Sequence, residues 1–248
     1  MLRLCAITAL LLFSLSAVLP AAAEPSQLWN RNALTFSGYS WDAKNGYYHP
    51  GKNHWRAQNA WVDAKGWLHL QLTQTEGTWH CAEVASTSLF SYGLYRFQVA
   101  GRIDQLDKNA VLGLFLYPGP QLRHRSDVEI DVEFSRWGKV NDPPGNFTVL
   151  PNSWSFPVHL QGELTTHQIL WLPDRIEFSS YHGHGEPSTE TLLAKRTFSS
   201  GDSSLFPTPP LQLHINYWLF KGLLPEQLNP QEIIIRRVDY TPAGNGKL

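Results

Sequence analysis

Three carboxylates alternate with aliphatic residues over residues 126–134. Glu129, Asp131 and Glu133 occupy every second position of this segment, and its valines and isoleucine occupy the positions between them. A period of two with β-branched residues is typical of a β-strand, whose successive side chains point to opposite faces. No Lys or Arg is interleaved to balance the row. The pattern therefore predicts a strand that buries its aliphatic face and presents three acids together for a chemical purpose.

Acid–base cleavage of a glycosidic bond is one reaction that paired carboxylates perform. Four residues of strand separate the Cα atoms of Glu129 and Glu133 by roughly 13 Å. Side-chain length, strand twist and curvature permit the separation of about 5–5.5 Å that retaining glycosidases use, or the wider gap of inverting ones. Asp131 lies between the two, where it is placed to orient one carboxyl and to raise a neighbour's pKa. Calcium is the alternative ligand, but a calcium site usually draws its oxygens from a loop.

The elements that must position these acids are predicted to be short strands. Alternating or fully apolar runs separated by Gly and Pro turns occur throughout, and the run at 110–117 is apolar on both faces, as in a central strand. The expected strands are residues 60–62, 66–73, 93–103, 110–117, 128–134, 147–150, 166–172, 175–181, 211–218 and 232–240. A helix of one or two turns at 190–195 is the best helical candidate. This pattern predicts an all-β fold, a β-sandwich jelly roll of two antiparallel sheets.

The composition and the N-terminus predict an exported, single-domain protein. Arg3, an apolar run at 9–18 and three alanines at 21–23 indicate a signal peptide over residues 1–23 and a mature domain over 24–248. The chain carries 20 Lys+Arg and 21 Asp+Glu, which leaves no basic stripe for nucleic acid. We expect a monomer in the periplasm or outside the cell, without a membrane anchor. Cys81 remains as a lone cysteine after cleavage, and we expect it to be a buried apolar side chain.

The acidic segment resembles the active-site signature of glycoside hydrolase family 16, in its form without a bulge, E-x-D-x-E. This form is typical of the lichenase and xyloglucan transglycosylase branches. The resemblance implies a concanavalin A-like jelly roll with an active-site cleft on its concave face. Further segments are similar to the family's C-G-E, Y-G-x-Y/F-E, F-x-Y-x-G and M-N-L-W stretches: residues 81–83, 92–97, 115–119 and 213–218.

By position, the resemblance implies roles for the three acids in a double displacement. Glu129 is implied as the nucleophile, Asp131 as its assistant, and Glu133 as the acid and then the base. Five further residues are implied as lining the substrate cleft: Glu83, Phe115, Tyr117, Asn216 and Trp218. For each of these five the structural alternative is a core aromatic or a polar group on a strand face.

The chain also departs from the lichenase pattern. Ala85 stands where lichenases have an Arg, and Thr148 stands where they have an Asn. Arg236 stands where they have an Asp that binds structural calcium, so we expect no cofactor and the calcium lacks support in the sequence. Asp127-Val128 precedes the first Glu, where the family often has Trp or His followed by Asp.

The predicted function is an exported retaining endo-hydrolase of a polysaccharide that resembles β-1,3-1,4- or β-1,3-glucan. Two alternatives stay open. The same site would catalyse transglycosylation if a sugar hydroxyl replaced water, and a jelly roll that had lost activity would be a carbohydrate-binding protein. The sequence does not distinguish the polymer or its linkage.

Overall fold

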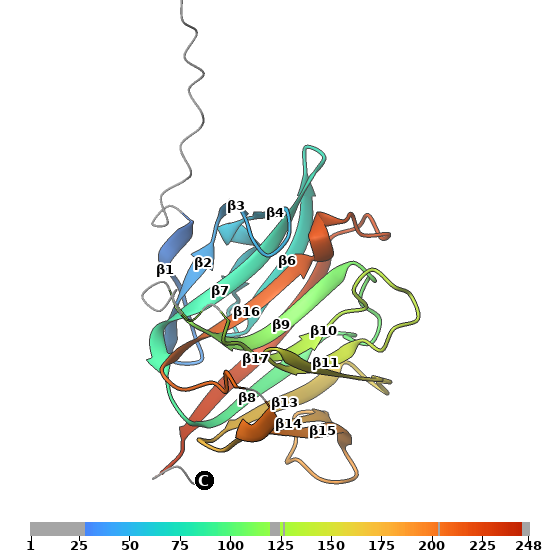
Figure 1. Ribbon diagram of the computed structural model, residues 1–248. Coiled ribbons are helices and arrows are strands. Elements are labelled where there is room, and N and C mark those ends of the chain that lie inside the picture. Colours follow the sequence, from blue (N-terminus) through green and yellow to red (C-terminus); the bar gives the residue numbers. More distant parts are fainter. Residues whose placement is uncertain (1–27, 120–124, 126, 203, 245–248) are drawn as a thin grey trace, which may run out of the picture.

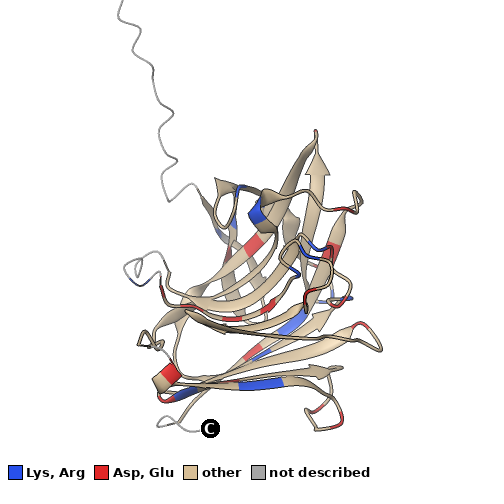
Figure 2. Cartoon of the chain, turned by 45° about the vertical axis from the view of Figure 1, so that its right-hand side comes forward, with Lys and Arg blue, Asp and Glu red and all other residues tan. Residues whose placement is uncertain are grey.

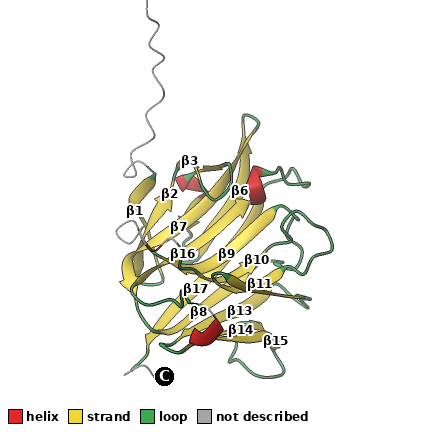
Figure 3. Ribbon diagram, viewed as in Figure 1, coloured by secondary structure: helices red, strands yellow, loops and turns green. Residues whose placement is uncertain are grey.

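The computed structural model describes residues 28–119, 125, 127–202 and 204–244 (Figure 1). The signal peptide predicted at residues 1–23 lies outside these ranges. Within them the chain is almost entirely β-structure, with short 3-10 turns at Ala57–Asn59, Ser200–Asp202 and Phe220–Gly222 (Figure 3). Two antiparallel sheets lie against each other and curve in the same sense. The predicted all-β jelly roll is confirmed.

The first sheet, here called the cleft sheet, has the strand order β1-β2-β7-β16-β9-β10-β11-β12. Each of these neighbours is antiparallel. Its strands are β1 (Trp29–Phe36), β2 (Tyr39–Lys44), β7 (Thr78–Phe90), β16 (Leu211–Leu219), β9 (Ala110–Tyr117), β10 (Ile130–Phe134), β11 (Gly145–Val149) and β12 (Asn152–Phe156). Most of each strand is free of charged residues, so the few positions of Asp and Glu stand out in red in Figure 2.

The second sheet, here called the back sheet, has the order β5-β6-β17-β8-β13-β14-β15. Its strands are β5 (Ala60–Val62), β6 (Leu68–Thr75), β17 (Gln231–Pro242), β8 (Gly93–Ala100), β13 (Leu164–Trp171), β14 (Arg175–His182) and β15 (Leu192–Ser199). A small hairpin of β3 (Gly46–Tyr48) and β4 (Asn53–Trp55) pairs with the first part of β7 in the cleft sheet, where β4 runs parallel to β7.

The core fills the space between the two sheets, because the apolar side chains at alternate positions of the strands point inward. Leu68, Leu70 and Leu72 of β6 are fully buried, as the alternation at 66–73 predicts. Val132 and Ile130 of β10 are also fully buried, so the strand places its acids on the opposite face. Burying each such aliphatic side chain contributes about 1.5–3 kcal/mol, which holds the acidic face toward the outside of the sandwich.

The predicted strands are found with small shifts at their ends, and one predicted element is wrong. Residues 190–195, the helical candidate, lead into β15 instead of forming a helix. Lys195 of β15 pairs with Ser179 of β14, and the side chains of Ala194 and Phe198 enter the core. The hydrogen bonds and burial available at the edge of the back sheet outweigh the weak helical preference of this short segment.

Candidate active site

The structure brings the three acids to the outer, concave face of the cleft sheet. Asp131 and Glu133 lie on β10, whereas Glu129 precedes the first residue of that strand. The Glu129 carbonyl still accepts a hydrogen bond from the Leu150 backbone N–H, which holds the residue in line with the sheet. The strand predicted at 128–134 is therefore shorter than expected, yet its alternation persists through all three acids.

Burial raises the pKa of all three carboxyls, and neighbouring carboxylate charges add to the effect. Burial raises the pKa of Glu133 to about 8, and the Glu129 charge adds to the effect. Burial also raises the pKa of Glu129 to about 7, although a hydrogen bond from Asp131 acts in the opposite direction. The pKa of Asp131 is raised well above its usual range by burial and by the charges of both neighbours. A protonated Asp131 thus donates to Glu129, and the raised pKa of Glu133 favours its protonated form near neutral pH.

A cleft of about 580 Å³ opens beside these acids, and Glu129 and Glu133 line it. All five residues that were predicted to border a substrate cleft also line it: Glu83, Phe115, Tyr117, Asn216 and Trp218. Asp131 is not among the lining residues, because it is 3% exposed and lies between the two glutamates. The supporting role that the resemblance implies for Asp131 stays a prediction.

Strand β16 forms the floor of the cleft with four alternate side chains. Gln212, His214, Asn216 and Trp218 all line it, and each has a buried polar atom that finds no hydrogen-bond partner in the described part of the chain. These atoms are Gln212 Oε1, His214 Nε2, Asn216 Oδ1 and Trp218 Nε1. Buried polar groups are normally paired, so four unpaired ones on one strand indicate a surface built to bind a polar ligand. Gln212 and His214 were missed in the sequence, although they share the parity of the two predicted residues.

A transverse row of residues links the acids to the far side of the cleft. Glu133 pairs with Gly113 of β9, Gly113 with Asn216 of β16, and Asn216 with Glu83 of β7. A Cβ atom at Gly113 would lie 2.5 Å from Asn216 Oδ1. Glycine is therefore required at this position for the Asn216 amide to lie over β9, toward Glu133.

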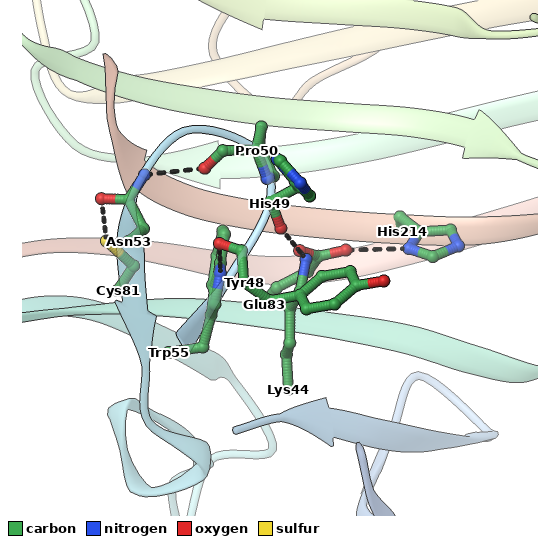
Figure 4. Close-up of polar contacts among 9 residues, drawn as sticks. All are labelled: Lys44, Tyr48, His49, Pro50, Asn53, Trp55, Cys81, Glu83 and His214. Carbon is green, nitrogen blue, oxygen red and sulfur yellow. Dashed lines mark hydrogen bonds and ion pairs between the residues drawn. The ribbon is translucent and has the colours of Figure 1, made fainter. Parts of the chain in front are cut away.

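Lys44, Glu83 and His214 form a buried polar chain at the other end of this row (Figure 4). Lys44 Nζ lies 2.5 Å from Glu83 Oε2, and His214 Nδ1 lies 3.1 Å from Glu83 Oε1. Burial opposes the ionisation of Glu83, but the Lys44 charge and the His214 contact outweigh it and lower the pKa of Glu83. Both oxygens of this carboxylate are thus engaged by protein groups. Neither Lys44 nor His214 was predicted, because cross-strand partners are not visible in a linear pattern.

The β3–β4 hairpin is fastened to this chain and forms one wall of the cleft. Lys44 Nζ donates to the His49 carbonyl at 2.7 Å, and Trp55 Nε1 donates to the Tyr48 carbonyl at 2.9 Å (Figure 4). The Lys44 ammonium also lies 4.1 Å from the centroid of the Trp55 ring. Tyr48 and His49 line the cleft, and Tyr48 is 52% exposed. The wall is therefore held by the same lysine that neutralises Glu83.

Other predicted features of the sequence have clear structural outcomes. Cys81 is fully buried, as predicted, and burial raises the pKa of its thiol to about 12, which excludes a nucleophilic thiolate near neutral pH. The position related to a calcium ligand does not fit a cation, because the Arg236 guanidinium lies 4.2 Å from the centroid of the Trp67 ring. Across the described residues, no group of three or more His, Cys, Asp or Glu side chains is arranged to hold a metal ion.

The chain is similar to known β-glucanases in both sequence and structure. It is 33% identical over 128 residues to a beta-glucanase of Paenibacillus macerans, a match that covers 50% of this chain and 49% of that protein. The matched region thus spans about half the length of that relative. No protein-family model matches the chain.

Solved structures match over most of the chain. The Bacillus licheniformis beta-glucanase superposes with a TM-score of 0.60 at 21% identity, covering 86% of this chain and 96% of that one. A beta-1,3-1,4-glucanase (lichenase) derived from a mouse hindgut metagenome gives 0.58 at 20% identity, covering 86% and 98%. A glycosyl hydrolase family 16 protein of Mycobacterium smegmatis gives 0.61 at 13% identity, covering 84% and 94%. The predicted resemblance to family 16 is confirmed at the level of the fold.

Proposed function

We propose that this protein is a retaining endo-β-glucan hydrolase. The observation that carries the proposal is the order of the acids along β10: two cleft-lining glutamates with raised pKa values flank a buried aspartic acid. Burial and the Glu129 charge favour a protonated Glu133 near neutral pH, and the hydrogen bond from Asp131 favours the ionised form of Glu129. One carboxylate to attack and one carboxylic acid to donate a proton are what a double displacement requires. The similarity to β-glucanases supports a glucan as the substrate.

In the first step, a Glu129 oxygen attacks the anomeric carbon of the sugar on its side of the scissile bond. The glycosidic C–O bond breaks as a covalent ester forms, and Glu133 transfers its proton to the leaving oxygen. Asp131 donates its hydrogen bond to Glu129, which orients the attacking carboxylate and stabilises its charge. The sugar chain on the leaving side then departs with a free hydroxyl.

In the second step, water takes the place of the departed chain. Glu133 is now a carboxylate, so it accepts a proton from this water as the water oxygen attacks the anomeric carbon. The ester bond to Glu129 breaks, the nucleophile returns as a carboxylate, and Glu133 returns to its protonated form. Two displacements at one carbon restore its original configuration. An acceptor sugar hydroxyl in place of water would give transglycosylation at the same site.

A reducing-end assay on mixed-linkage β-1,3-1,4-glucan and on β-1,3-glucan tests this proposal. We expect new reducing ends on at least one of the two, together with a rapid fall in polymer length that marks endo-cleavage. Product sizing separates hydrolysis from transfer, since transfer also yields chains longer than the substrate. Binding to either polymer with no new reducing ends would instead favour a carbohydrate-binding protein and would overturn the proposal.

We also propose that the protein is exported. The support is the charged, apolar and small-residue order of residues 1–23 and the polymeric nature of the proposed substrate, which does not cross membranes. In the described part of the chain, no helix is long and apolar enough to cross a membrane. N-terminal sequencing of the protein recovered from periplasm or medium should begin at Glu24. Recovery of the intact chain from the cytoplasm alone would contradict export.

A further inference from the structure

We propose that His214 contacts the glycan and sets specificity, with its Nε2 accepting a hydrogen bond from a sugar hydroxyl. The inference rests on the proposed glucan hydrolase function and assigns part of its substrate recognition. His214 lies on β16 opposite Phe115, which itself lies opposite Asp131. At about 4.8 Å per strand, His214 is therefore about 10 Å from the acidic strand, on the floor of the cleft. This distance places it beside a sugar unit that is bound but does not react.

The Glu83 contact determines which nitrogen of His214 carries the proton. Glu83 has a lowered pKa and is a carboxylate, and a carboxylate only accepts hydrogen bonds. The Nδ1 atom, 3.1 Å from Glu83 Oε1, must therefore be the protonated nitrogen. In the neutral imidazole this leaves Nε2 as a bare acceptor. That atom is buried and has no hydrogen-bond partner among the residues that the structure describes.

The surroundings of His214 fix the ring in this orientation. Its ring stacks on Phe115 with centroids 5.0 Å apart, and the Tyr117 and Trp29 rings meet it edge-on at 6.0 and 6.1 Å. Lys44 balances the charge of Glu83 from the other side, so that Lys44, Glu83 and a neutral His214 together carry no net charge (Figure 4). A rigid ring with one open acceptor is preorganised for a single donor, which limits the entropy lost on binding.

The chemistry of the cleft floor indicates a neutral sugar as that donor. Gln212, two residues before His214, also lines the cleft. It donates its Nε2 to the Ser86 carbonyl, which leaves the buried Oε1 as a second acceptor without a partner among the described residues. Two adjacent acceptors suit hydroxyl groups, which donate, and disfavour sulfate or carboxylate substituents, which only accept. Glu83 itself has both oxygens engaged, so His214 is the group through which that buried carboxylate influences the sugar.

Equilibrium binding to an inactive background tests the proposal. Glu129→Gln prevents turnover, and a mixed-linkage gluco-oligosaccharide is titrated calorimetrically into it with and without His214→Asn. The Asn amide reproduces the donor to Glu83 but lacks an atom at the Nε2 position. Loss of one hydrogen bond should weaken binding about 2- to 10-fold. The same change at His184, whose Nε2 contacts the Val99 carbonyl in the back sheet, is the matched control and should leave binding unchanged.

A second measurement leaves the His214 side chain unchanged. The side-chain ¹⁵N resonances of the histidines should show His214 Nε2 unprotonated in the free Glu129→Gln protein and shifted upfield when the oligosaccharide is added. Equal affinity of the His214→Asn protein, an Nε2 resonance that does not move, or tighter binding of a sulfated or uronic oligosaccharide would overturn the inference. Wild-type activity on the glucans is measured in parallel: if it is absent, the proposed function fails, whereas activity with an unaffected His214→Asn protein refutes only this inference.

Discussion

Replacing Glu133 with Gln should stabilise the protein at neutral pH while removing the proposed general acid. The pKa of Glu133 rises from 4.5 to about 8 because burial and the Glu129 charge disfavour its ionised form. A carboxyl that binds its proton more tightly when folded makes the folded state lose stability as pH rises from the unfolded pKa toward the folded one. Glutamine has the same shape and does not ionise, so the variant escapes this loss.

The magnitude follows from the two pKa values. With a pKa of 4.5 in the unfolded chain and about 8 in the folded one, the penalty is about 1 kcal/mol at pH 5 and about 3 kcal/mol at pH 7. The stability gain of Glu133→Gln over wild type should therefore grow by about 1–2 kcal/mol between these two pH values, because water in the cleft reduces the effect of burial.

Urea unfolding of both proteins at pH 5, 6 and 7 measures this difference. Glu177→Gln provides the control, because Arg175 lowers the pKa of that carboxyl and leaves it ionised in both states across the same range. Its free-energy difference from wild type should stay flat from pH 5 to pH 7. A flat difference for Glu133→Gln as well would refute the claim that the folded protein holds a protonated acid at this position.

Three further predictions concern the rest of the cleft. Lys44→Met leaves the buried Glu83 carboxylate without its counterion and should cost about 3–5 kcal/mol in chemical denaturation at pH 7, part of which Glu83→Gln in the same chain restores; an unchanged midpoint would contradict the pairing. Gly113→Ala places a methyl group where the Asn216 side-chain amide lies, and so forces that amide away from Glu133. The value of kcat/KM on the glucan should then fall about tenfold or more while the unfolding midpoint moves little. Full activity would show that catalysis does not depend on the position of the Asn216 amide. The rate should fall as pH rises through about 8, because Glu133 then loses the proton that it must donate, and a rate that is constant to pH 10 would exclude this acid.

The acidic strand and the β-sandwich could both be predicted from the sequence, because both depend on the local alternation of apolar and polar residues. Glu129, Asp131 and Glu133 follow from the period of two that the fold preserves even where Glu129 precedes β10. Asn216 and Trp218 of β16 were predicted from the resemblance to the family's M-N-L-W stretch and not from alternation. Gln212 and His214 lie at alternate positions of the same strand and line the same cleft.

Side-chain contacts between neighbouring strands could not be predicted from the sequence. Lys44 and Glu83 are 39 residues apart and meet only because β2 pairs with β7 in one register. The structure of residues 190–195 also depends on a contact between strands. Pairing with β14, and not the helix propensity of the segment itself, makes these residues lead into β15. Register is set by the packing of the whole sheet, and one sequence does not display it.

The central claim is that Glu129 forms a covalent bond with the sugar. Incubation with a 2-deoxy-2-fluoro glucoside that has a good leaving group should trap this ester, because the fluorine slows its hydrolysis more than its formation. Mass spectrometry of the digested protein should then place one added glycosyl unit on the peptide containing Glu129, and on none in the Glu129→Gln protein. Turnover of the glucan with no adduct, and with inverted configuration of the first product by proton NMR, would contradict the double displacement.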